Sequence, residues 1–505
     1  MKVSLKFVCL CGVTLSFSCL VVSICWLRML KETDDAGVFS LEVALGRDGE
    51  LVVPVPVGER AVVRVVPKDL LEHEALDEAE TSSSKPPLSS SKSAANNKAE
   101  LSSKVECCGS PLNANVEFSL ISGCTTVINT WSVAKLYFEG SKSLLNSMYK
   151  SSTSHFYKTM TEYHCFLHSA RLAAQTTGVV GPRVVLCGKP GTGKHTLLRT
   201  LGNLAARTSW HPTLVDLSLE TQSIGLPQCI GAASLDYPLA LDETYDNCVS
   251  LCYMVGRPPT AEGMVDPLYR HYTRELLQSV VQRLQHEGDE QRIVRSSGCL
   301  VLVPYTVGGI EAAEFVRDVV ETIDATHVCC IGDAQLFAQL HTAMAGSSFG
   351  DEKCVTSKGT LVHTCFLAST TSPMMRSVAL LRSAANTRCS ILFNGAGNIT
   401  ATPMRVKRRL NQVVLLRLSW REGRPFASKI EGREMHQCAG LVAAVVDVAA
   451  KSSASLFQTP VLAFAQVISV DVVEVIVLVA AVESALPTGI LTLVVSDFCW
   501  TDESK

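Results

Sequence analysis

Short runs of alternating apolar and polar residues form the first patterned region of the chain. Residues 39–66 read FSLEVALGRDGELVVPVPVGERAVVRVV, in which β-rich runs are separated by the turn-like sequences GRDG and VGE. Residues 116–140 resume the same pattern. Alternating runs bounded by Gly and Asp are typical of strands joined by tight turns. The pattern predicts an N-terminal β domain over residues 37–144.

A polar tract interrupts this β pattern. Residues 78–104 are rich in Ser, Lys, Ala and Pro. Such a composition buries too little apolar surface to fold by itself, so it predicts a disordered insertion. Because strand-like sequence returns after it, we expect it to be inserted within the β domain. It is either a partner-binding segment or a spacer, and its composition favours a spacer.

Helical and strand-like patterns alternate from residue 145 onward. Amphipathic helical periodicity is present at 161–175, just after 196 and at 265–286, and nearly continuous apolar strands lie at 183–188, 213–217, 299–303, 327–331 and 361–368. Fully apolar strands that alternate with helices are typical of a parallel sheet covered on both faces. We therefore predict a central domain over residues 145–403. From residue 404 to 505 the pattern returns to strands, which predicts a C-terminal β domain.

The sequence GKPGTGKHT at 188–196 is the strongest candidate for chemistry. It differs by one residue from the phosphate-binding P-loop pattern Gly-x-x-x-x-Gly-Lys-[Ser/Thr]. An apolar strand precedes it and an amphipathic helix follows it, as a P-loop requires. A structural glycine turn is the alternative. The pattern predicts an α/β fold whose central domain is a P-loop NTPase domain, and the candidate nucleotide-binding residues are Gly188, Gly191, Gly193, Lys194, His195 and Thr196.

His195 stands where the P-loop pattern has the hydroxyl that binds magnesium. Mg²⁺ prefers oxygen ligands, which an imidazole does not offer. Thr196 comes one residue later, so its hydroxyl is expected to point elsewhere on the helix. Either the loop binds nucleotide with weakened Mg²⁺ coordination, or a water and another oxygen replace the missing ligand. The metal-binding and catalytic residues stay open.

The composition excludes few functions and few cellular locations. The 505 residues carry a net charge of −3 and 18% charged residues, which gives no global electrostatic reason to expect a nucleic-acid-binding surface. The 20 cysteines show no zinc-type spacing, so reduced and mostly buried thiols are expected. Reduced thiols favour the cytosol or the nucleus.

The N-terminal segment 1–30 suggests a different location. Residues 7–27 are apolar, uncharged and long enough to span a bilayer, with basic residues on both sides. Read literally, the segment is a signal anchor. The alternative is a mis-assigned start, with translation beginning at Met29.

Several motifs together resemble one known family. They are FSLEV at 39–43, SGCTTVINTW ending at Trp131, GPRVVLCGKPGTGKHT around the P-loop, LPQCIGA and SSGCLVLV. The chain resembles the RNA 5′-hydroxyl kinase family, and more closely the ATP-binding subunits of the eukaryotic pre-mRNA cleavage factor. The resemblance begins near residue 37 and continues to the end, apart from the polar insertion. The segment 7–27 has no counterpart in it.

The resemblance implies a nucleotide site between the N-terminal and central domains. It implies ATP, with or without Mg²⁺, and it makes Glu42 the best match for the acidic residue of the adenine pocket. It also implies a cleavage-factor scaffold subunit and other 3′-end processing proteins as partners, weak or indirect contact with RNA, and a nuclear location.

The chain departs from the family at most catalytic positions. The family's Asp-x-Gly-Gln motif corresponds to Ser-Leu-Glu-Thr at 218–221, and Asp216 and Glu220 lie near it in sequence. A shift of two residues along a strand displaces a side chain by about 7 Å. The other departures are Pro258 and Pro259 for paired threonines, the sequence at 302–306 for an RNA-stacking motif, and Ala385 and Ser390 for two lid arginines. The resemblance with these departures predicts an ATP-binding subunit with weak or no kinase activity. The alternatives are an active ATP-dependent RNA 5′-hydroxyl kinase and a membrane-anchored P-loop NTPase.

Overall fold

The structure, a computed structural model, describes most of the chain between residues 31 and 501. The described ranges are 31–32, 38–56, 59–66, 105–120, 125–150, 156–258, 265–286, 288, 291–304, 310–344, 354–369, 377–396, 399–447, 456–480, 486–487 and 489–501. The apolar segment 7–27 and the polar segment 78–104 lie outside them. Within the described ranges, no helix combines the length and the hydropathy that a membrane span needs.

The N-terminal β domain consists of two antiparallel sheets that enclose one hydrophobic core. The first has the order β1-β2-β9-β4-β7 and the second the order β10-β3-β8-β5-β6. Side chains of β9 and β4 are alternately buried and partly exposed, as expected for strands with one face on a core. The elements are β1 Lys31–Glu32, β2 Phe39–Leu45, β3 Glu50–Pro54, β4 Ala61–Val65, β5 Val105–Cys107, β6 Ser110–Pro111, β7 Glu117–Leu120, β8 Thr125–Thr130, β9 Ala134–Gly140, α2 Lys142–Ser147 and β10 Tyr149–Lys150.

Strands on both sides of the polar segment 78–104 belong to this domain. β4 precedes the segment and β5 follows it, in facing sheets. Val63 and Val105 from these strands are buried in the same core. The chain therefore leaves and re-enters one domain around the segment.

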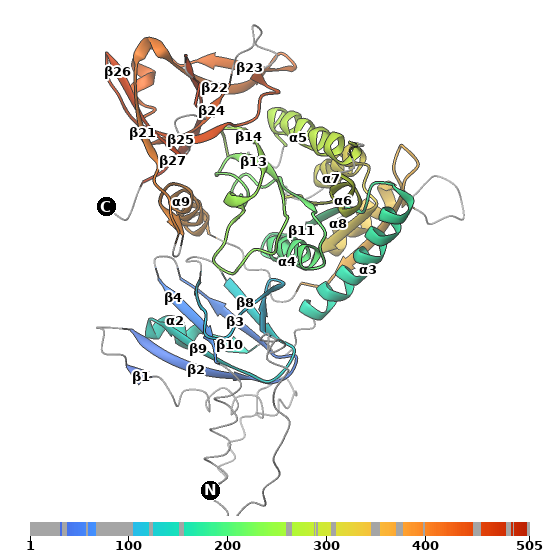
Figure 1. Ribbon diagram of the computed structural model, residues 1–505. Helices are drawn as coiled ribbons and strands as arrows, with labels where there is room; N and C mark the ends of the chain where they lie inside the picture. The colour runs from blue at the N-terminus through green and yellow to red at the C-terminus, as the bar shows by residue number, and fades with distance from the viewer. Residues whose placement is uncertain are drawn as a thin grey trace, which may run out of the picture.

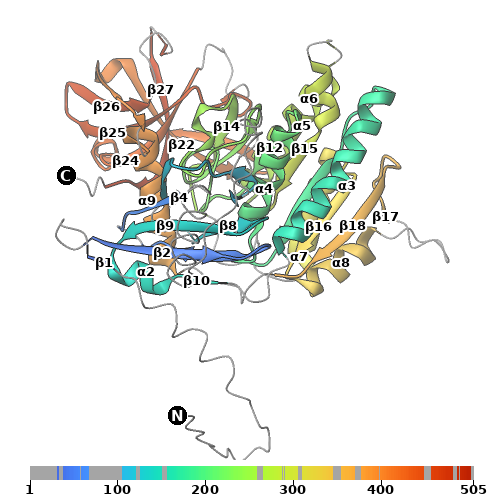
Figure 2. The same cartoon turned by 60° about the horizontal axis from the view of Figure 1, so that its bottom comes forward.

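The central domain is built on an eight-stranded sheet of order β14-β13-β12-β15-β11-β16-β18-β17. One hydrophobic cluster joins the sheet to α3 and α4, and a second joins its other face to α5, α7 and α8. Helices therefore cover both faces (Figures 1 and 2). The elements are α3 Phe156–Thr177, β11 Arg183–Gly188, α4 Lys194–Arg207, β12 Thr213–Asp216, β13 Cys229–Ser234, β14 Ser250–Met254, α5 Pro267–Gln285, α6 Arg292–Ser297, β15 Cys299–Leu302, α7 Ile310–Ile323, β16 His327–Ile331, α8 Ala334–Met344, β17 Cys354–Val355, β18 Leu361–Leu367 and α9 Val378–Asn394.

Only the middle of this sheet is parallel. The five strands β12, β15, β11, β16 and β18 run parallel, whereas β13, β14 and β17 are antiparallel to their neighbours. The expected α/β architecture is confirmed, with this correction at the two edges. Between β12 and β13 the connection 217–228 contains no helix, so β13 returns beside β12 in the opposite direction. This connection carries part of the candidate site.

The C-terminal β domain is a seven-stranded sheet of order β21-β26-β25-β24-β27-β22-β23. It joins the central domain through α9, where the rings of Phe393 and Trp500 stack with centroids 4.9 Å apart. In Figure 1 its strands lie at the opposite end of the molecule from the N-terminal strands. The strands are β21 Met404–Arg409, β22 Val413–Arg421, β23 Arg424–Lys429, β24 Leu441–Val446, β25 Ala463–Val470, β26 Glu474–Ala480 and β27 Leu491–Cys499.

Candidate functional site

The P-loop connects the central strand β11 to the N-terminus of α4. Gly188, Gly191 and Gly193 have φ values of 132°, 72° and 94°, a region that favours glycine. Gly193 caps α4, so the loop delivers backbone N–H groups and the positive end of the helix dipole to one place. Consecutive N–H groups at a helix N-terminus form an anion-binding site. The local geometry therefore fits a phosphate group.

Lys194 lies at the base of this loop. Its Nζ donates hydrogen bonds to the carbonyl oxygens of Gly188 at 2.7 Å and Lys189 at 2.6 Å. The residue is only 7% exposed, and burial lowers the pKa of its ammonium group to about 8. A buried ammonium group beside a nest of N–H donors gains stability when an anion binds, because the anion replaces the lost hydration.

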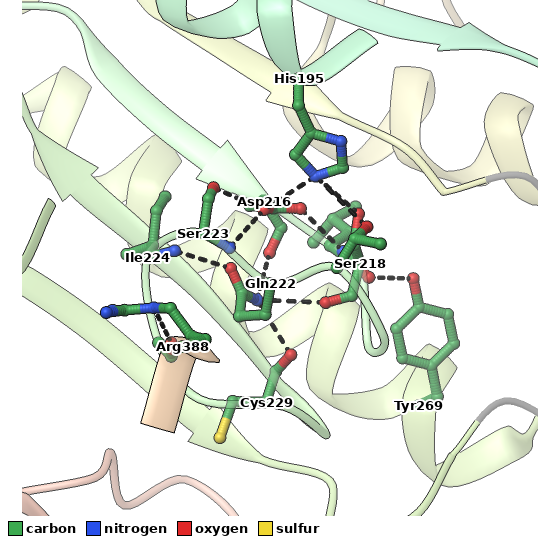
Figure 3. A network of polar contacts seen from close by, with 12 residues as sticks. His195, Asp216, Ser218, Gln222, Ser223, Ile224, Cys229, Tyr269 and Arg388 are labelled. Carbon is green, nitrogen blue, oxygen red and sulfur yellow. Dashed lines mark hydrogen bonds and ion pairs between the residues drawn. The ribbon is translucent and has the colours of Figure 1, made fainter. Parts of the chain in front are cut away.

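His195 does not point into solvent but contacts the loop that follows β12. Its Nε2 lies 3.3 Å from Oδ2 of Asp216, 3.4 Å from Oγ of Ser218 and 3.4 Å from Oγ1 of Thr221. Oxygen atoms of Asp216, at the end of β12, and of two residues in the connection that follows therefore converge on a single ring nitrogen (Figure 3). The side chain of His195 stays 38% exposed.

The carboxylate of Asp216 is fully buried and closely held. Oδ1 accepts a hydrogen bond from the Ser218 N–H at 2.9 Å, and Oδ2 accepts from the Ser223 N–H at 2.9 Å and from its hydroxyl at 2.7 Å. Burial opposes ionisation, but His195 and these donors outweigh it and hold the pKa of Asp216 below its usual value. Asp216 is therefore a carboxylate at neutral pH.

Gln222 fixes the same connection from inside. Its Nε2 donates to the carbonyl oxygens of Asp216 at 3.1 Å and Cys229 at 2.9 Å, and the N–H of Ile224 donates to its Oε1 at 3.0 Å. These bonds join the beginning and the end of the connection (Figure 3). The partners of His195 therefore sit on a well-supported loop.

The sequence indicated that position 195 lacks the hydroxyl that binds magnesium and that Asp216 is displaced from the family's carboxylate position. It did not predict that the two side chains contact each other. Asp216 lies two residues before position 218, which corresponds to the first residue of the family's motif. The imidazole extends farther from the backbone than a serine hydroxyl does, and its Nε2 lies 3.3 Å from Oδ2 of Asp216. Asp216 is the last residue of β12, and His195 follows the P-loop that begins at the end of β11. The C-terminal ends of these parallel strands lie at one edge of the sheet. That shared edge was the signal that could have suggested the pair.

Thr196 points away from His195, toward the N-terminal domain. It lines a cavity of about 60 Å³ between α4 and the N-terminal sheets. Its lining residues come from α3, α4 and three strands or turns of the N-terminal domain: Glu50, Cys108, Val127, Asn129, Tyr157, Met160, Gly193, Thr196 and Thr200. Thr196 therefore faces this cavity and not the contact between His195 and Asp216.

Glu42, the expected adenine-pocket residue, lies on β2. Its carboxylate pairs with Lys135 at 3.0 Å and is 40% exposed. It does not line the cavity described above, where the carboxylate from the N-terminal domain belongs to Glu50. The assignment of Glu42 to a nucleotide pocket stays a prediction.

The resemblance places a lid at α9 and just before it, where the chain carries Arg376, Arg382 and Arg388. Arg388 is 8% exposed and donates to Asp246 through both Nη1, at 2.6 Å, and Nη2, and through Nε to the carbonyl oxygen of Gly225 at 2.9 Å. Arg382 is exposed on α9, whereas Arg376 lies outside the described residues. Arg388 therefore ties α9 to the central domain.

Other family positions are partly outside the described residues. Pro258 is exposed and Leu302 is the last residue of β15. Pro259 and residues 305–306 are not described.

Comparison with known proteins identifies the family. A model of the mRNA cleavage and polyadenylation factor CLP1 P-loop matches residues 188–362. A second model, for the N-terminal β-sandwich domain of polyadenylation factor, matches residues 93–174. The chain belongs to the CLP1 family. Membership agrees with the resemblance drawn from the motifs.

Relatives of the CLP1 family match this chain over part of their length. The CLP1 homolog of Arabidopsis thaliana is 32% identical over 33% of this chain and 36% of its own length. The polyribonucleotide 5′-hydroxyl-kinase Clp1 of Xenopus laevis is 28% identical over 40% of this chain and 44% of its own length. The matched region thus spans less than half of the length of each of these relatives.

Solved structures match over nearly the whole chain. A structure of a Clp1p–Pcf11p complex gives a TM-score of 0.71 with 17% identity, covering 94% of this chain and 100% of that chain. Another describes an extended Pcf11p–Clp1p interface and the basis of ATP loss in a point mutant, with a TM-score of 0.70, 17% identity and coverage of 92% and 99%. At this identity the likeness establishes the fold alone.

A P-loop domain of this family implies nucleotide binding, and the residues present fit the phosphate part of a nucleotide better than they fit magnesium. The nest and Lys194 suit an anion. The hydroxyl that would bind Mg²⁺ is replaced by His195, whose nitrogen lies against the nearest carboxylate. Among the described residues, no group of three or more His, Cys, Asp or Glu side chains is placed to hold a metal ion. The ring nitrogen at position 195 does not suit Mg²⁺, which prefers oxygen ligands.

Proposed function

We propose that this CLP1-family chain binds ATP and retains it as a structural nucleotide, with weak or no kinase activity. The observation that carries the proposal is the contrast within one site. The glycines of the P-loop and Lys194 keep an anion-binding geometry, whereas His195 closes against Asp216 at the position where phosphoryl transfer needs a metal. Phosphoryl transfer depends mainly on positioning and charge neutralisation. Losing the metal ligand while keeping the nest favours binding over turnover.

The biological setting that we propose is the mRNA 3′-end cleavage and polyadenylation machinery in the nucleus. The family's description as an mRNA cleavage and polyadenylation factor supports it. A scaffold subunit of the Pcf11p kind is the partner that we propose, because the matched solved structures are complexes of Clp1p with Pcf11p. A bound nucleotide would stabilise the folded chain by mass action, which is a sufficient role for an unhydrolysed ligand.

The nucleotide content of the purified full-length protein tests the proposal. Denaturation releases the nucleotide, and chromatography identifies and quantifies it. We expect about one ATP per chain, and an empty Lys194→Ala variant. An empty wild-type protein would refute the proposal, and bound ADP would point to an active enzyme.

An active ATP-dependent RNA 5′-hydroxyl kinase is the second candidate, since matched relatives are named polyribonucleotide 5′-hydroxyl-kinase. Transfer of the γ-phosphate of labelled ATP to a 5′-hydroxyl oligoribonucleotide, absent in Lys194→Ala, would establish it. The third candidate, a membrane-anchored NTPase, depends on residues 7–27. A tagged full-length protein that fractionates with the nucleus and not with membranes would eliminate it.

A further inference from the structure

The contacts of His195 describe a place where a cation is expected. Oxygen atoms of Asp216, Ser218 and Thr221 lie within 3.4 Å of its Nε2, and one of them belongs to an ionised, fully buried carboxylate. A Mg²⁺ ion requires oxygen atoms at about 2.0–2.1 Å in octahedral geometry. Here a ring nitrogen fills the centre of the oxygen cluster, so the imidazole itself is the group that complements these oxygens.

The other side of the ring faces the opposite way. His195 directly follows Lys194 and lies in the first turn of α4, where the helix N-terminus presents its N–H groups to an anion. With Nε2 directed at Asp216, the second ring nitrogen is directed away from the carboxylate (Figure 3). In the protonated form both nitrogens carry N–H donors, so the ring can donate to Asp216 and to a phosphate oxygen together.

We propose that protonated His195, held by Asp216, replaces the metal ion as the cation that neutralises the phosphates, so that this site binds a nucleoside triphosphate without Mg²⁺. The inference rests on the nucleotide binding proposed above and names how that site works. Lys194 and His195 then supply two adjacent positive charges to the triphosphate.

A carboxylate lies against the ring of His195. Asp216 is the ionised group in contact with it, from β12. Glu220 lies in the same connection, and burial raises the pKa of its carboxyl group. The phenol groups of Tyr245 and Tyr269 lie close enough to influence Asp216, and burial raises the pKa of both, so they stay neutral. Among these acidic groups, Asp216 is therefore the one that places a negative charge beside the ring.

The neighbouring cations act in the opposite direction. Lys194 precedes His195 in the chain and carries a positive charge below about pH 8. Lys189, also in the loop, lies 3.9 Å from Asp333, which partly compensates its charge. Bound phosphate would remove the repulsion between Lys194 and His195. Protonation of His195 and binding of the triphosphate are therefore expected to promote each other.

The experiment measures the affinity of the full-length protein for ATP by calorimetry, in excess EDTA and in excess MgCl₂, between about pH 6 and about pH 8, where histidine changes charge. We expect wild-type protein to bind ATP in EDTA at least as tightly as in MgCl₂. The affinity in EDTA should fall about tenfold or more as the pH rises, because a neutral ring loses one donor and its charge.

Three variants make the result specific. His195→Gln should weaken binding in EDTA about tenfold or more at the lower pH and remove the pH dependence. His195→Ser restores a hydroxyl and should make binding depend on Mg²⁺. His211→Gln is the matched control, since His211 also lies near a carboxylate, 3.6 Å from Asp236, at similar exposure but away from the P-loop. It should behave like wild type, and melting temperatures confirm that each variant is folded.

Two results would overturn the inference while leaving nucleotide binding intact. They are a requirement for Mg²⁺ in the wild-type protein, and unchanged affinity and pH dependence in His195→Gln. A protein that binds no ATP in either condition would instead refute the proposed function itself, and the inference with it.

Discussion

Arg207, in the last turn of the P-loop helix α4, donates a hydrogen bond of 2.7 Å to Oε1 of Glu106 on β5 of the N-terminal domain. The same nitrogen donates to the carbonyl oxygen of Gly109 at 3.0 Å, and the Tyr157 hydroxyl donates to Oε2 of Glu106. The β5–β6 hairpin is thereby attached to the helix that begins at the phosphate site. Attachment at one end of α4 and phosphate binding at its other end should stabilise each other.

We expect Arg207→Ala to lower the free energy of unfolding by about 1 to 3 kcal/mol. The side chain of Glu106 is only 9% exposed, so its carboxylate would lose a charged partner within the interface. The effect should stay below that of a fully buried pair because Arg207 is 33% exposed. Equilibrium urea unfolding measures it.

Arg417→Ala is the control for this change. Arg417 lies 3.6 Å from Asp497 in the C-terminal domain, with both side chains about half exposed. Such a surface pair contributes about 0 to 1 kcal/mol. Equal losses in the two variants would contradict a specific role of Arg207 in joining the domains.

Gly109→Ala should loosen the same attachment by a steric route. Gly109 has a φ of 78°, and an added Cβ would lie 2.9 Å from the carbonyl oxygen of Thr200 and 3.2 Å from Cβ of Asn203 on α4. Gly359 has a similar φ of 83° but open space around it. Gly359→Ala therefore isolates the backbone cost of about 1 kcal/mol. We expect Gly109→Ala to destabilise the protein by at least about 1 kcal/mol more, because the hairpin must move.

Limited proteolysis and thermal melting measure this difference. The variant Gly109→Ala should expose the N-terminal domain to protease sooner than Gly359→Ala. If the two variants melt together and are cleaved at the same rate, the hairpin is not held as closely against α4 as the contact distances indicate.

Local patterns in the sequence predicted the five parallel strands and three of the helices of the central domain, and the β character of the C-terminal domain. The strand at 183–188 and the helix expected over 265–286 appear as β11 and α5, because burial periodicity is a property of neighbouring residues. The antiparallel edge formed by β13 and β14 was not predicted, since pairing direction depends on connections whose path the periodicity does not encode.

The residues that contact His195 are the main feature of the site that the sequence did not predict. The P-loop itself could be read from spacing, because its glycines, Lys194 and the helix are consecutive. Asp216, Ser218 and Thr221 reach His195 only because β12 ends at the same edge of the sheet as β11. Comparison with the family's motif, position by position, indicated a missing carboxylate at 218–221 and placed Asp216 only near it in sequence. It did not indicate that the imidazole at position 195 contacts oxygen atoms of these residues.

Arg388→Met should affect stability and not nucleotide exchange. Arg388 is buried and bonded to Asp246 and Gly225, so its removal leaves a carboxylate and a carbonyl group without their donor. We expect a loss of about 2 to 4 kcal/mol in urea unfolding, with unchanged affinity for ATP. Arg382→Met, on the exposed side of α9, is the matched control and should change stability by less than about 0.5 kcal/mol.

A lid role for Arg388 would produce a different result. Folded Arg388→Met protein, checked at a temperature well below its transition, would then release ATP faster than wild type. Arg388→Lys keeps a charge but loses the paired geometry with Asp246, and it should recover only part of the stability.

Lys194 should give the protein a second dependence on pH, above the range in which histidine titrates. Burial lowers the pKa of Lys194 to about 8, whereas an unfolded lysine titrates near about 10.4. Between these values the unfolded chain binds more protons, so the free energy of unfolding of nucleotide-free protein should rise with pH. Affinity for ATP should change in the opposite sense, because the phosphate site needs the ammonium form. It should fall toward tenfold for each pH unit above about 8.

Lys194→Arg tests this assignment, since a guanidinium keeps its charge throughout the range. Its affinity for ATP, even if lower than that of wild type, should be flat between about pH 8 and about pH 10, and its stability should lose the rise seen in wild type. The same slopes in both proteins would assign the titration to another group. A slope that is present in wild type and absent in Lys194→Arg reports the titration of Lys194.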